Sequence, residues 1–228
     1  MADWPWILKN RLRTSIQWIQ LELAVKRVLS QIHGDTFIDI GANIGLYSTL
    51  LRKNFNKIVA VEPNPYTFSV LNQRTRRYRN ITTMNIAMSD SDGTAPLFVS
   101  PPLRRRLRTV KWFYYSKLGF IGFPGSDSLL ENHPGGQTNL GSISVKTNRF
   151  DNIFSTLITD LVKMDVEGGE FRVLAGMHHS LERKRIRNLL IEIHDNSRRD
   201  ELESILSSKM DLLWIDSNHI LGRLRSDN

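Results

Sequence analysis

The chain has 228 residues, 40% hydrophobic and 24% charged, as expected for one globular domain with a full core, and its formal net charge is +8. It contains no cysteine, which excludes disulfides and thiolate metal sites. Because it shows neither a signal-peptide pattern nor an apolar stretch of about 20 residues, the sequence predicts a cytoplasmic protein without a membrane span.

The first 35 residues are expected to form a helical extension that packs on the core. Within residues 14–32, apolar side chains recur at helical spacing on one face: Ile16, Ile19, Leu23 and Val28. Trp4 and Trp6 precede this helix among basic residues. The two tryptophans either lie against the domain or contact a membrane surface, which would make the protein peripheral at the membrane.

Strand and helix patterns alternate along the rest of the chain. The expected strands span residues 36–40, 58–62, 82–88, 94–99, 142–147, 160–165, 188–194, 212–216 and 219–224. The expected helices span residues 45–54, 66–79, 168–176 and 198–209. This alternation predicts an α/β fold with a mostly parallel sheet of about seven strands, helices on both faces and one antiparallel strand near the end.

A glycine-rich turn follows the first expected strand, in the run TFIDIGANIG from Thr36 to Gly45. Glycines at a strand-to-helix turn let a ligand approach the backbone closely. The second expected strand ends on Glu62, where a carboxylate can accept both hydroxyls of a ribose. The two features together predict a nucleoside-containing cofactor.

The order of these residues argues against a dinucleotide. The dinucleotide fingerprint is G-x-G-x-x-G, whereas this loop has the order D-x-G-x-x-x-G, with Asp39, Gly41 and Gly45. Asn43 would crowd a pyrophosphate, and the carboxylate of Asp39 suits a cation better than a phosphate. S-adenosylmethionine has an ammonium and a sulfonium but no phosphate, so it is the expected cofactor.

Polar residues follow five of the expected strands, and the carboxyl ends of parallel strands meet at one edge of a sheet. They are Asp39 with Gly41 and Asn43, Glu62, Ser89 with Asp90, Asp165 with Glu167, and Glu192 with His194. The sequence therefore predicts a single site at this edge.

The same segments resemble the FkbM-type methyltransferases. VKMDVEGGEFRVLAGM (162–177) is similar to the signature of that family, and FIDIGANIGLYS (37–48) is similar to its cofactor loop. VAVEPNPYTFSVL (59–71), NIAMSDSDG (85–93) and LLIEIHD (189–195) resemble its next strand ends. The resemblance covers about residues 36–100 and 142–195 and implies a class I, Rossmann-like fold, S-adenosylmethionine as cofactor, and O-methylation of sugar or polyketide hydroxyls.

Cofactor contacts are expected from the three strand ends nearest the loop. Gly41, Ala42, Asn43 and Gly45 would pass under the methionine part of the cofactor. Asp39 would meet its ammonium directly or through water, and Glu62 would hold the ribose. Asp90 would lie near the adenine edge, with Ser89 sharing that role, unless Asp90 is only a turn residue in S-D-S-D-G.

Asp165, Glu167 and His194 are the candidate catalytic residues, because a hydroxyl becomes a good nucleophile when a base takes its proton. His194 is the favoured base, since histidine has an ordinary pKa of about 6.5. Asp165 and Glu167 would position substrate and cofactor, and Glu170 is expected at a helix start or as a structural partner. A metal could bind where four side chains converge, but with one histidine in the set no metal is predicted. The four are Asp165, Glu167, Glu192 and His194.

Residues 101–118 hold six Lys or Arg residues and no acidic residue: Arg104, Arg105, Arg106, Arg108, Lys111 and Lys117. Trp112 and three other aromatic residues lie among them. Arginines pair with phosphates and aromatic rings stack on sugars or bases. Three interpretations of the segment remain open. It is a lid that contacts a sugar on a phosphate-containing carrier, it binds RNA, or it is a solvated basic surface. In the first interpretation the contacts come from Arg104, Arg105, Arg106 and Trp112.

The sequence thus predicts a helical extension over residues 1–35 and a methyltransferase domain over 36–228, with a basic, aromatic insertion at about 100–141. The expected function is S-adenosylmethionine-dependent O-methyl transfer to a glycan or similar small hydroxyl compound. An RNA methyltransferase, favoured only by charge, and a non-catalytic protein that binds the cofactor or a partner remain as alternatives.

Overall fold

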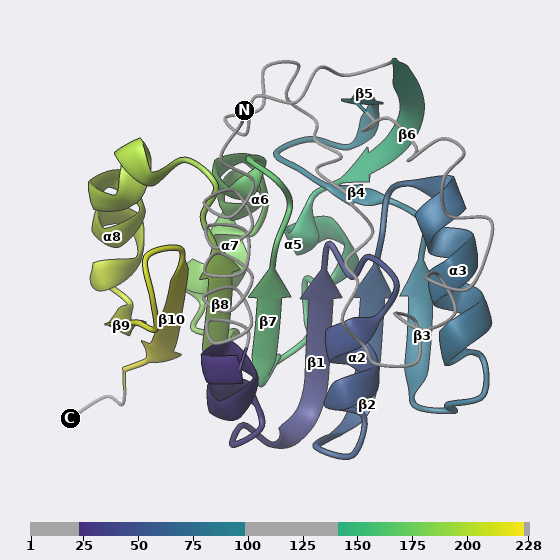
Figure 1. Ribbon diagram of the computed structural model, residues 1–228. Helices are drawn as coiled ribbons and strands as arrows, with labels where there is room; N and C mark the ends of the chain where they lie inside the picture. Colours follow the sequence, from purple (N-terminus) through teal and green to yellow (C-terminus); the bar gives the residue numbers. More distant parts are fainter. Residues whose placement is uncertain (1–22, 99–140, 226–228) are drawn as a thin grey trace, which may run out of the picture.

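The computed structural model describes residues 23–98 and 141–225. Its main sheet has seven strands in the order β3-β2-β1-β7-β8-β10-β9 (Figure 1). The strands are β1 (Gly34–Ile40), β2 (Phe55–Val61), β3 (Ile81–Met84), β7 (Leu161–Met164), β8 (Asn188–Glu192), β9 (Met210–Trp214) and β10 (His219–Leu224). All pairings are parallel except those of β10, which is antiparallel to β8 and β9. This arrangement confirms the predicted fold class.

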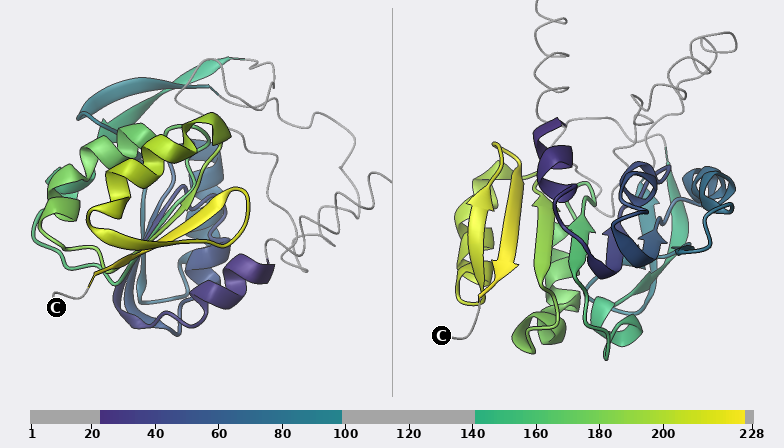
Figure 2. Two further views of the ribbon diagram at one scale, coloured as in Figure 1. Left: turned by 90° about the vertical axis from the view of Figure 1, so that its left-hand side faces the viewer. Right: turned by 90° about the horizontal axis from the view of Figure 1, so that it is seen from below.

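Helices cover both faces of the main sheet (Figure 2). They are α2 (Leu46–Leu50), α3 (Pro65–Thr75), α5 (Phe150–Ile153), α6 (Glu170–Gly176), α7 (His178–Glu182) and α8 (Arg199–Ser207), with a 3-10 turn at Asn196–Arg198. Successive strand residues face opposite ways. Ile38 and Val162 therefore pack with α5, α6, α7 and α8, whereas Phe37 and Leu161 pack with α2 on the other face.

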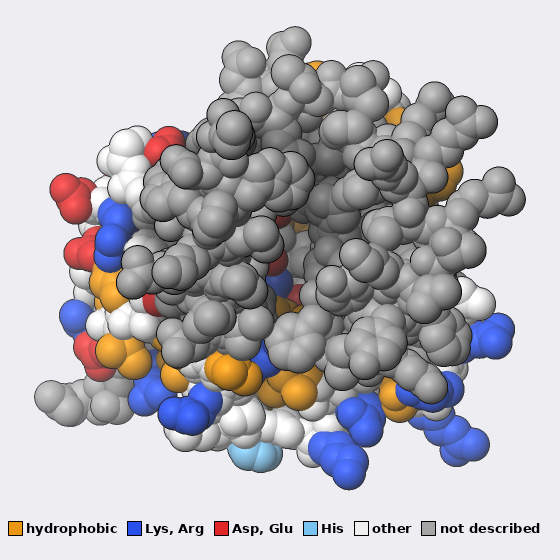
Figure 3. All heavy atoms as spheres, in the orientation of Figure 1, with side chains coloured by type: hydrophobic (Ala, Val, Ile, Leu, Met, Phe, Trp, Pro, Cys, Tyr) orange, Lys and Arg blue, Asp and Glu red, His pale blue; other side chains and the backbone are white. Residues whose placement is uncertain are grey.

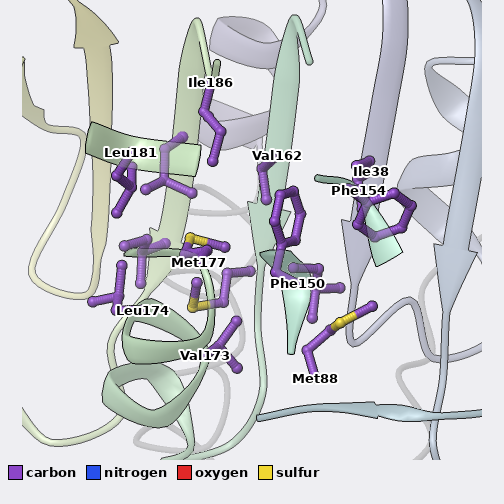
Figure 4. Close-up of a cluster of buried hydrophobic side chains, with 14 of the residues drawn as sticks. Ile38, Met88, Phe150, Phe154, Val162, Val173, Leu174, Met177, Leu181 and Ile186 are labelled. Atoms are coloured by element: carbon purple, nitrogen blue, oxygen red, sulfur yellow. The ribbon is translucent and has the colours of Figure 1, made fainter. Parts of the chain in front are cut away.

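The larger core lies between the sheet and α5 to α8 (Figure 4). Phe150 and Phe154 pack ring against ring at 4.8 Å between centroids and lie over Ile38 and Val162. Met177, at the junction of α6 and α7, is fully buried. Burying such apolar surface is the main stabilising contribution to a fold of this size.

The described part of the predicted N-terminal extension packs on the opposite face. Residues 23–29 are helical, and Val25 and Leu29 are buried against the sheet. The predicted face needs correction, because Leu23 is 53% exposed while Val25 is 1% exposed. The rest of the predicted helix, with Trp4 and Trp6, lies outside the described residues.

A second, smaller sheet corrects the strand predicted over residues 82–88. That segment leaves the main sheet after Met84, because the Asn85 side chain donates to the backbone oxygens of Glu62 and Pro63 at 2.8 and 2.9 Å. The chain then forms β4 (Ala87–Met88), which joins β6 (Ser142–Asn148) and β5 (Gly93–Phe98) in the order β4-β6-β5. The small sheet lies beyond the carboxyl edge of the main one (Figure 1).

Candidate active site

The loop between β1 and α2 bends through three residues with positive φ: Gly41 at 72°, Asn43 at 50° and Gly45 at 80°. A Cβ on Gly41 would lie 1.7 Å from the backbone oxygen of Asp165, so glycine is required there by the chain's own packing. At Gly45 a Cβ would lie 2.6 Å from Leu71. The loop is therefore held against β7 on one side and α3 on the other.

Glu62 follows β2 and is fixed by the backbone around it. Its Oε2 accepts the Asn43 N–H and its Oε1 accepts the Asn64 N–H, both at 2.9 Å. The residue is 7% exposed and lines a pocket together with Gly41 and Asn43. Because two backbone donors orient the carboxylate, it presents a preorganised pair of acceptors to a ligand.

Asp39 is buried behind this loop, and its predicted contact with the cofactor ammonium, directly or through water, stays a prediction. The side chain is fully buried and is not among the residues that line the pocket. Its Oδ2 accepts the N–H and the hydroxyl of Ser48 at 3.1 and 2.6 Å, which anchors the first turn of α2. Burial raises the pKa of Asp39, and the Lys163 ammonium 3.8 Å away opposes that rise.

The pocket lies at the carboxyl edge of the main sheet, closed by the small sheet. It is lined by Ile40, Gly41, Asn43, Val61, Glu62, Pro63, Thr67, Ile86, Ala87, Met88, Leu97, Asp165, Val166, Glu167 and Gly169. Three of these residues are acidic and none is Lys or Arg, among the residues that the structure describes. Such a lining fits a cationic ligand and disfavours phosphates.

Ser89 and Asp90 are not among the residues that line this pocket, and their predicted contact with the adenine edge stays a prediction. Asp90 is exposed and accepts the hydroxyls of Ser89 and Ser91. The chain residues just before them, Ile86, Ala87 and Met88, line the pocket instead. Sequence reasoning missed these apolar residues because they were assigned to the interior of one continuous strand.

Asp165 follows β7 and pairs with a buried lysine that the sequence patterns did not single out. Lys163 Nζ lies 3.2 Å from Asp165 Oδ2 and 5.1 Å from the centre of the Tyr47 ring. Burial alone would raise the pKa of Asp165, but Lys163 and His194 hold it below its usual range. A charged residue within the apolar run of β7 was the available signal.

His194 lies beside Glu167, and four carboxylates surround its ring. Nδ1 lies 2.8 Å from Glu170 Oε1, and Nε2 lies 3.2 Å from Glu167 Oε2. Nε2 also lies 3.8 Å from Asp165 Oδ1 and 4.0 Å from Glu192 Oε1. Two predicted catalytic carboxylates and the predicted histidine therefore meet at one point.

The charges in this cluster shift two pKa values strongly. Burial, reinforced by Asp165 and other carboxylates, raises the pKa of Glu167 to about 8. Burial would lower the pKa of His194, but the hydrogen bond with Glu170 and the charge of Glu167 raise it to about 9. The expectation that His194 titrates near its ordinary value needs correction.

Three of these side chains satisfy a distance criterion for a metal. Ligand atoms of Asp165, Glu167 and His194 all lie within 4.8 Å of one another. However, the Lys163 ammonium is 3.2 Å from Asp165, and the His194 ring lies 3.2 Å from Glu167. Both carboxylates therefore already have a basic side chain as partner, and the absence of a metal stays a prediction.

The predicted substrate contacts Arg104, Arg105, Arg106 and Trp112 lie outside the described residues, as does the predicted lid at residues 101–118. No helix in the described ranges is long and apolar enough to span a membrane.

The sheet order, with a glycine loop after β1 and a carboxylate after β2, defines a class I methyltransferase fold. A family model described as Methyltransferase FkbM domain matches residues 39–209. The chain therefore belongs to the FkbM methyltransferase family and is an S-adenosylmethionine-dependent methyltransferase. The family predicted from sequence is thus confirmed.

Named relatives agree with this assignment. The chain is 28% identical to "Methyltransferase sdnD" of Sordaria araneosa, over 75% of this chain and 71% of that protein. It is 27% identical to "Hexuronic acid methyltransferase AglP" of Haloferax volcanii, over 85% and 72%. The solved "Methyltransferase FkbM" of Methylobacillus flagellatus shares the fold with a TM-score of 0.54 at 17% identity, over 83% of this chain. This chain spans 43% of that protein's length.

Proposed function

We propose that this methyltransferase acts on a hydroxyl group of a sugar or a similar small molecule. The observation that carries the proposal is the pocket that joins Glu62 to Asp165 and Glu167 without any Lys or Arg in its described lining. One relative, at 27% identity, is named a hexuronic acid methyltransferase, which supports a sugar acceptor.

The residues of the pocket fit the parts of S-adenosylmethionine. Glu62 would accept the two ribose hydroxyls, as a carboxylate after the second strand does in nucleoside sites. Pro63, Ile86 and Met88 supply apolar surface next to it for the adenine. Asp165 would lie on the side of the ammonium and sulfonium, whose positive charges its carboxylate attracts.

When bound, S-adenosylmethionine supplies a methyl group on a sulfonium, and the methyl–sulfur bond breaks with its electron pair staying on sulfur. The chain holds the acceptor oxygen in line with that bond and takes the hydroxyl proton as the oxygen–methyl bond forms. Glu167, in place of the predicted His194, is our candidate for the base, because it lines the pocket and its pKa of about 8 lies nearer neutral pH than the value of about 9 for His194. The His194 Nε2 at 3.2 Å would stabilise its carboxylate.

Calorimetric titration with S-adenosylmethionine and S-adenosylhomocysteine tests the cofactor site. We expect binding to the wild type and a loss of at least about tenfold in Glu62→Ala, since hydrogen bonds to a charged group contribute about 1.5–3 kcal/mol. Glu182→Ala is the matched control, because Glu182 is half-exposed and pairs with Lys209. Absence of binding to the wild type would refute the proposed use of this pocket.

Sugars that carry hydroxyl and carboxylate groups are the first acceptors to screen, with methyl transfer followed by mass spectrometry. The predicted contacts Arg104, Arg105, Arg106 and Trp112 belong to this test. Neutralising the three arginines should raise KM for an anionic acceptor and leave affinity for the methyl donor unchanged. Unchanged kinetics would remove these arginines from the substrate site.

A further inference from the structure

Glu170 is the last acidic residue of the segment VKMDVEGGE, and it starts α6. It is 1% exposed. Its Oε1 is an acceptor for two groups, the Gly168 N–H at 2.9 Å and the Nδ1 of His194 at 2.8 Å. A carboxylate buried to this degree requires such donors. Glu170 therefore joins the turn that carries Glu167 to the histidine that faces Glu167.

The hydrogen bond with Glu170 fixes the orientation of the His194 ring and determines which nitrogen keeps the proton when the ring is neutral. The same Oε1 already accepts the Gly168 N–H, so Nδ1 is assigned as the donor to this oxygen. Nε2 is then the nitrogen that faces Glu167 Oε2 at 3.2 Å and Asp165 Oδ1 at 3.8 Å. A ring turned the other way would not form the hydrogen bond with Glu170.

We propose that Glu170 is a positioning residue for methyl transfer: it holds the Nδ1–H of His194 and so directs Nε2 at the pocket-lining carboxylate of Glu167. This inference rests on the proposed function, in which Glu167 takes the hydroxyl proton. Glu170 is not among the residues that line the pocket, so it acts through His194 and not on the ligands.

Other charged groups also face His194, and Glu170 differs from them in geometry. Asp165 and Glu167 approach Nε2 from the end of β7, and Glu192 approaches it from β8. His219 of β10 faces the far oxygen of Glu192 at 3.3 Å. Glu170 forms the hydrogen bond with Nδ1, so its removal takes away that constraint on the proton arrangement of the ring.

The wild-type protein provides a first test that needs neither methyl donor nor acceptor. In 15N-labelled protein, the ring-nitrogen shifts of His194, assigned with His194→Gln, report the position of its proton across pH. We expect the neutral form at high pH to carry the proton on Nδ1. A neutral form protonated on Nε2 would overturn the inference, whatever the outcome for the proposed function.

A double-mutant cycle with methyl-transfer kinetics provides the second test. We expect Glu170→Gln to lower kcat at least tenfold without raising KM for the methyl donor, and to add nothing in the His194→Gln background. Glu170→Asp, which keeps the charge, should recover part of the rate. If the double variant loses the product of the two single-variant losses in kcat, the two residues act independently and the inference is overturned. A wild type without methyl transfer would refute the proposed function instead, and the nitrogen shifts would still decide the role of Glu170.

Discussion

At the scale of single residues, Gly41 is the point where the loop after β1 packs against the backbone that follows β7. The sequence predicts glycine here because a ligand approaches the backbone. The structure shows a nearer cause, since the backbone oxygen of Asp165 occupies the space that a side chain would need. The φ of 72° adds a second requirement, because left-handed backbone is unfavourable for residues with a Cβ.

Gly41→Ala is therefore expected to destabilise the fold. The left-handed backbone alone costs about 1 kcal/mol or more. The collision with Asp165 adds to that, so we expect the free energy of unfolding to fall by about 2 kcal/mol or more. Chemical denaturation measures the change. Gly141→Ala is the control, because its Cβ would enter open space, and equal losses in the two variants would contradict the argument.

Glu167 should make stability depend on pH. Its folded pKa of about 8 lies above the ordinary 4.5, so the folded state binds the proton more tightly and stability falls as pH rises from 4.5 towards 8. His194, at about 9 against 6.5, contributes stability that is fully present below pH 6.5 and lost as pH rises through 9. We expect the melting temperature of Glu167→Gln to fall less than that of the wild type between pH 6.5 and 9. A parallel decline in both proteins would contradict the raised pKa.

The positions of the strand ends in the sequence predicted part of the site. The rest depends on the directions of side chains, which the spacing of residues does not give. Gly41, Asn43, Glu62, Asp165 and Glu167 line one pocket, as the strand-end rule suggests. That rule gives the edge at which a residue lies, but not whether its side chain points into the pocket or into the core. It therefore could not predict that Asp39 is buried, or that Glu170 reaches His194.

At the scale of elements, short helices depend on contacts from neighbouring elements. α5 and α7 have four and five residues, too few for a helical period in the sequence, so neither was predicted. α7 starts at His178, just after the helix predicted over residues 168–176. Asp151 of α5 accepts the N–H groups of His179 and Ser180 at 2.8 Å, as an N-terminal cap does.

Asp151→Ala should weaken the packing of α7 without affecting the pocket. Three donors lose their acceptor, including the Ser180 hydroxyl, so we expect a loss of about 1–3 kcal/mol. Thermal unfolding measures it, with donor affinity unchanged by calorimetry. Asp211→Ala is the matched control, since Asp211 is largely exposed and its ion pair with Arg225 should contribute about 0–1 kcal/mol. A similar small loss in both variants would show that the cap is dispensable.

The break between β3 and β4 shows where element prediction failed. Residues 82–88 alternate as one strand would, and the alternation carries no mark of the change of sheet. The change depends on the amide of Asn85, which donates to the backbone after β2. Such a contact joins residues distant in sequence, so a local pattern cannot reveal it.

At the scale of the whole molecule, charge is unevenly distributed between the two edges of the main sheet. Residues 46–81 hold seven lysines and arginines but one acidic residue, Glu62. Several of them precede β2 and β3, at the edge opposite the pocket, and Lys and Arg side chains are visible along the lower margin of the molecule (Figure 3). There Arg52 and Arg77 lie over the Tyr78 ring, at 5.1 and 4.9 Å.

Within the described residues, this distribution places a basic surface away from the pocket, which bears on the RNA alternative. A nucleic acid held by Arg76, Arg77 and Arg79 would lie at the edge away from the pocket, so binding there would not present a base for methylation. We expect the triple glutamine variant to bind duplex RNA less tightly and to bind the methyl donor as before. The slope of log affinity against log salt concentration should become shallower by about 0.9 for each phosphate that the variant no longer neutralises.

The control for that experiment removes the same charge elsewhere. Arg172, Arg198 and Arg199 lie in α6 and at the start of α8, after β7 and β8, so their replacement by glutamine lowers the net charge equally on the pocket side. If binding depends on the local basic edge, this variant should retain more affinity for RNA than the first. Equal losses of RNA affinity in the two variants would mean that net charge alone governs the attraction. A loss of affinity for the methyl donor in the first variant would mean that the two edges of the sheet are coupled.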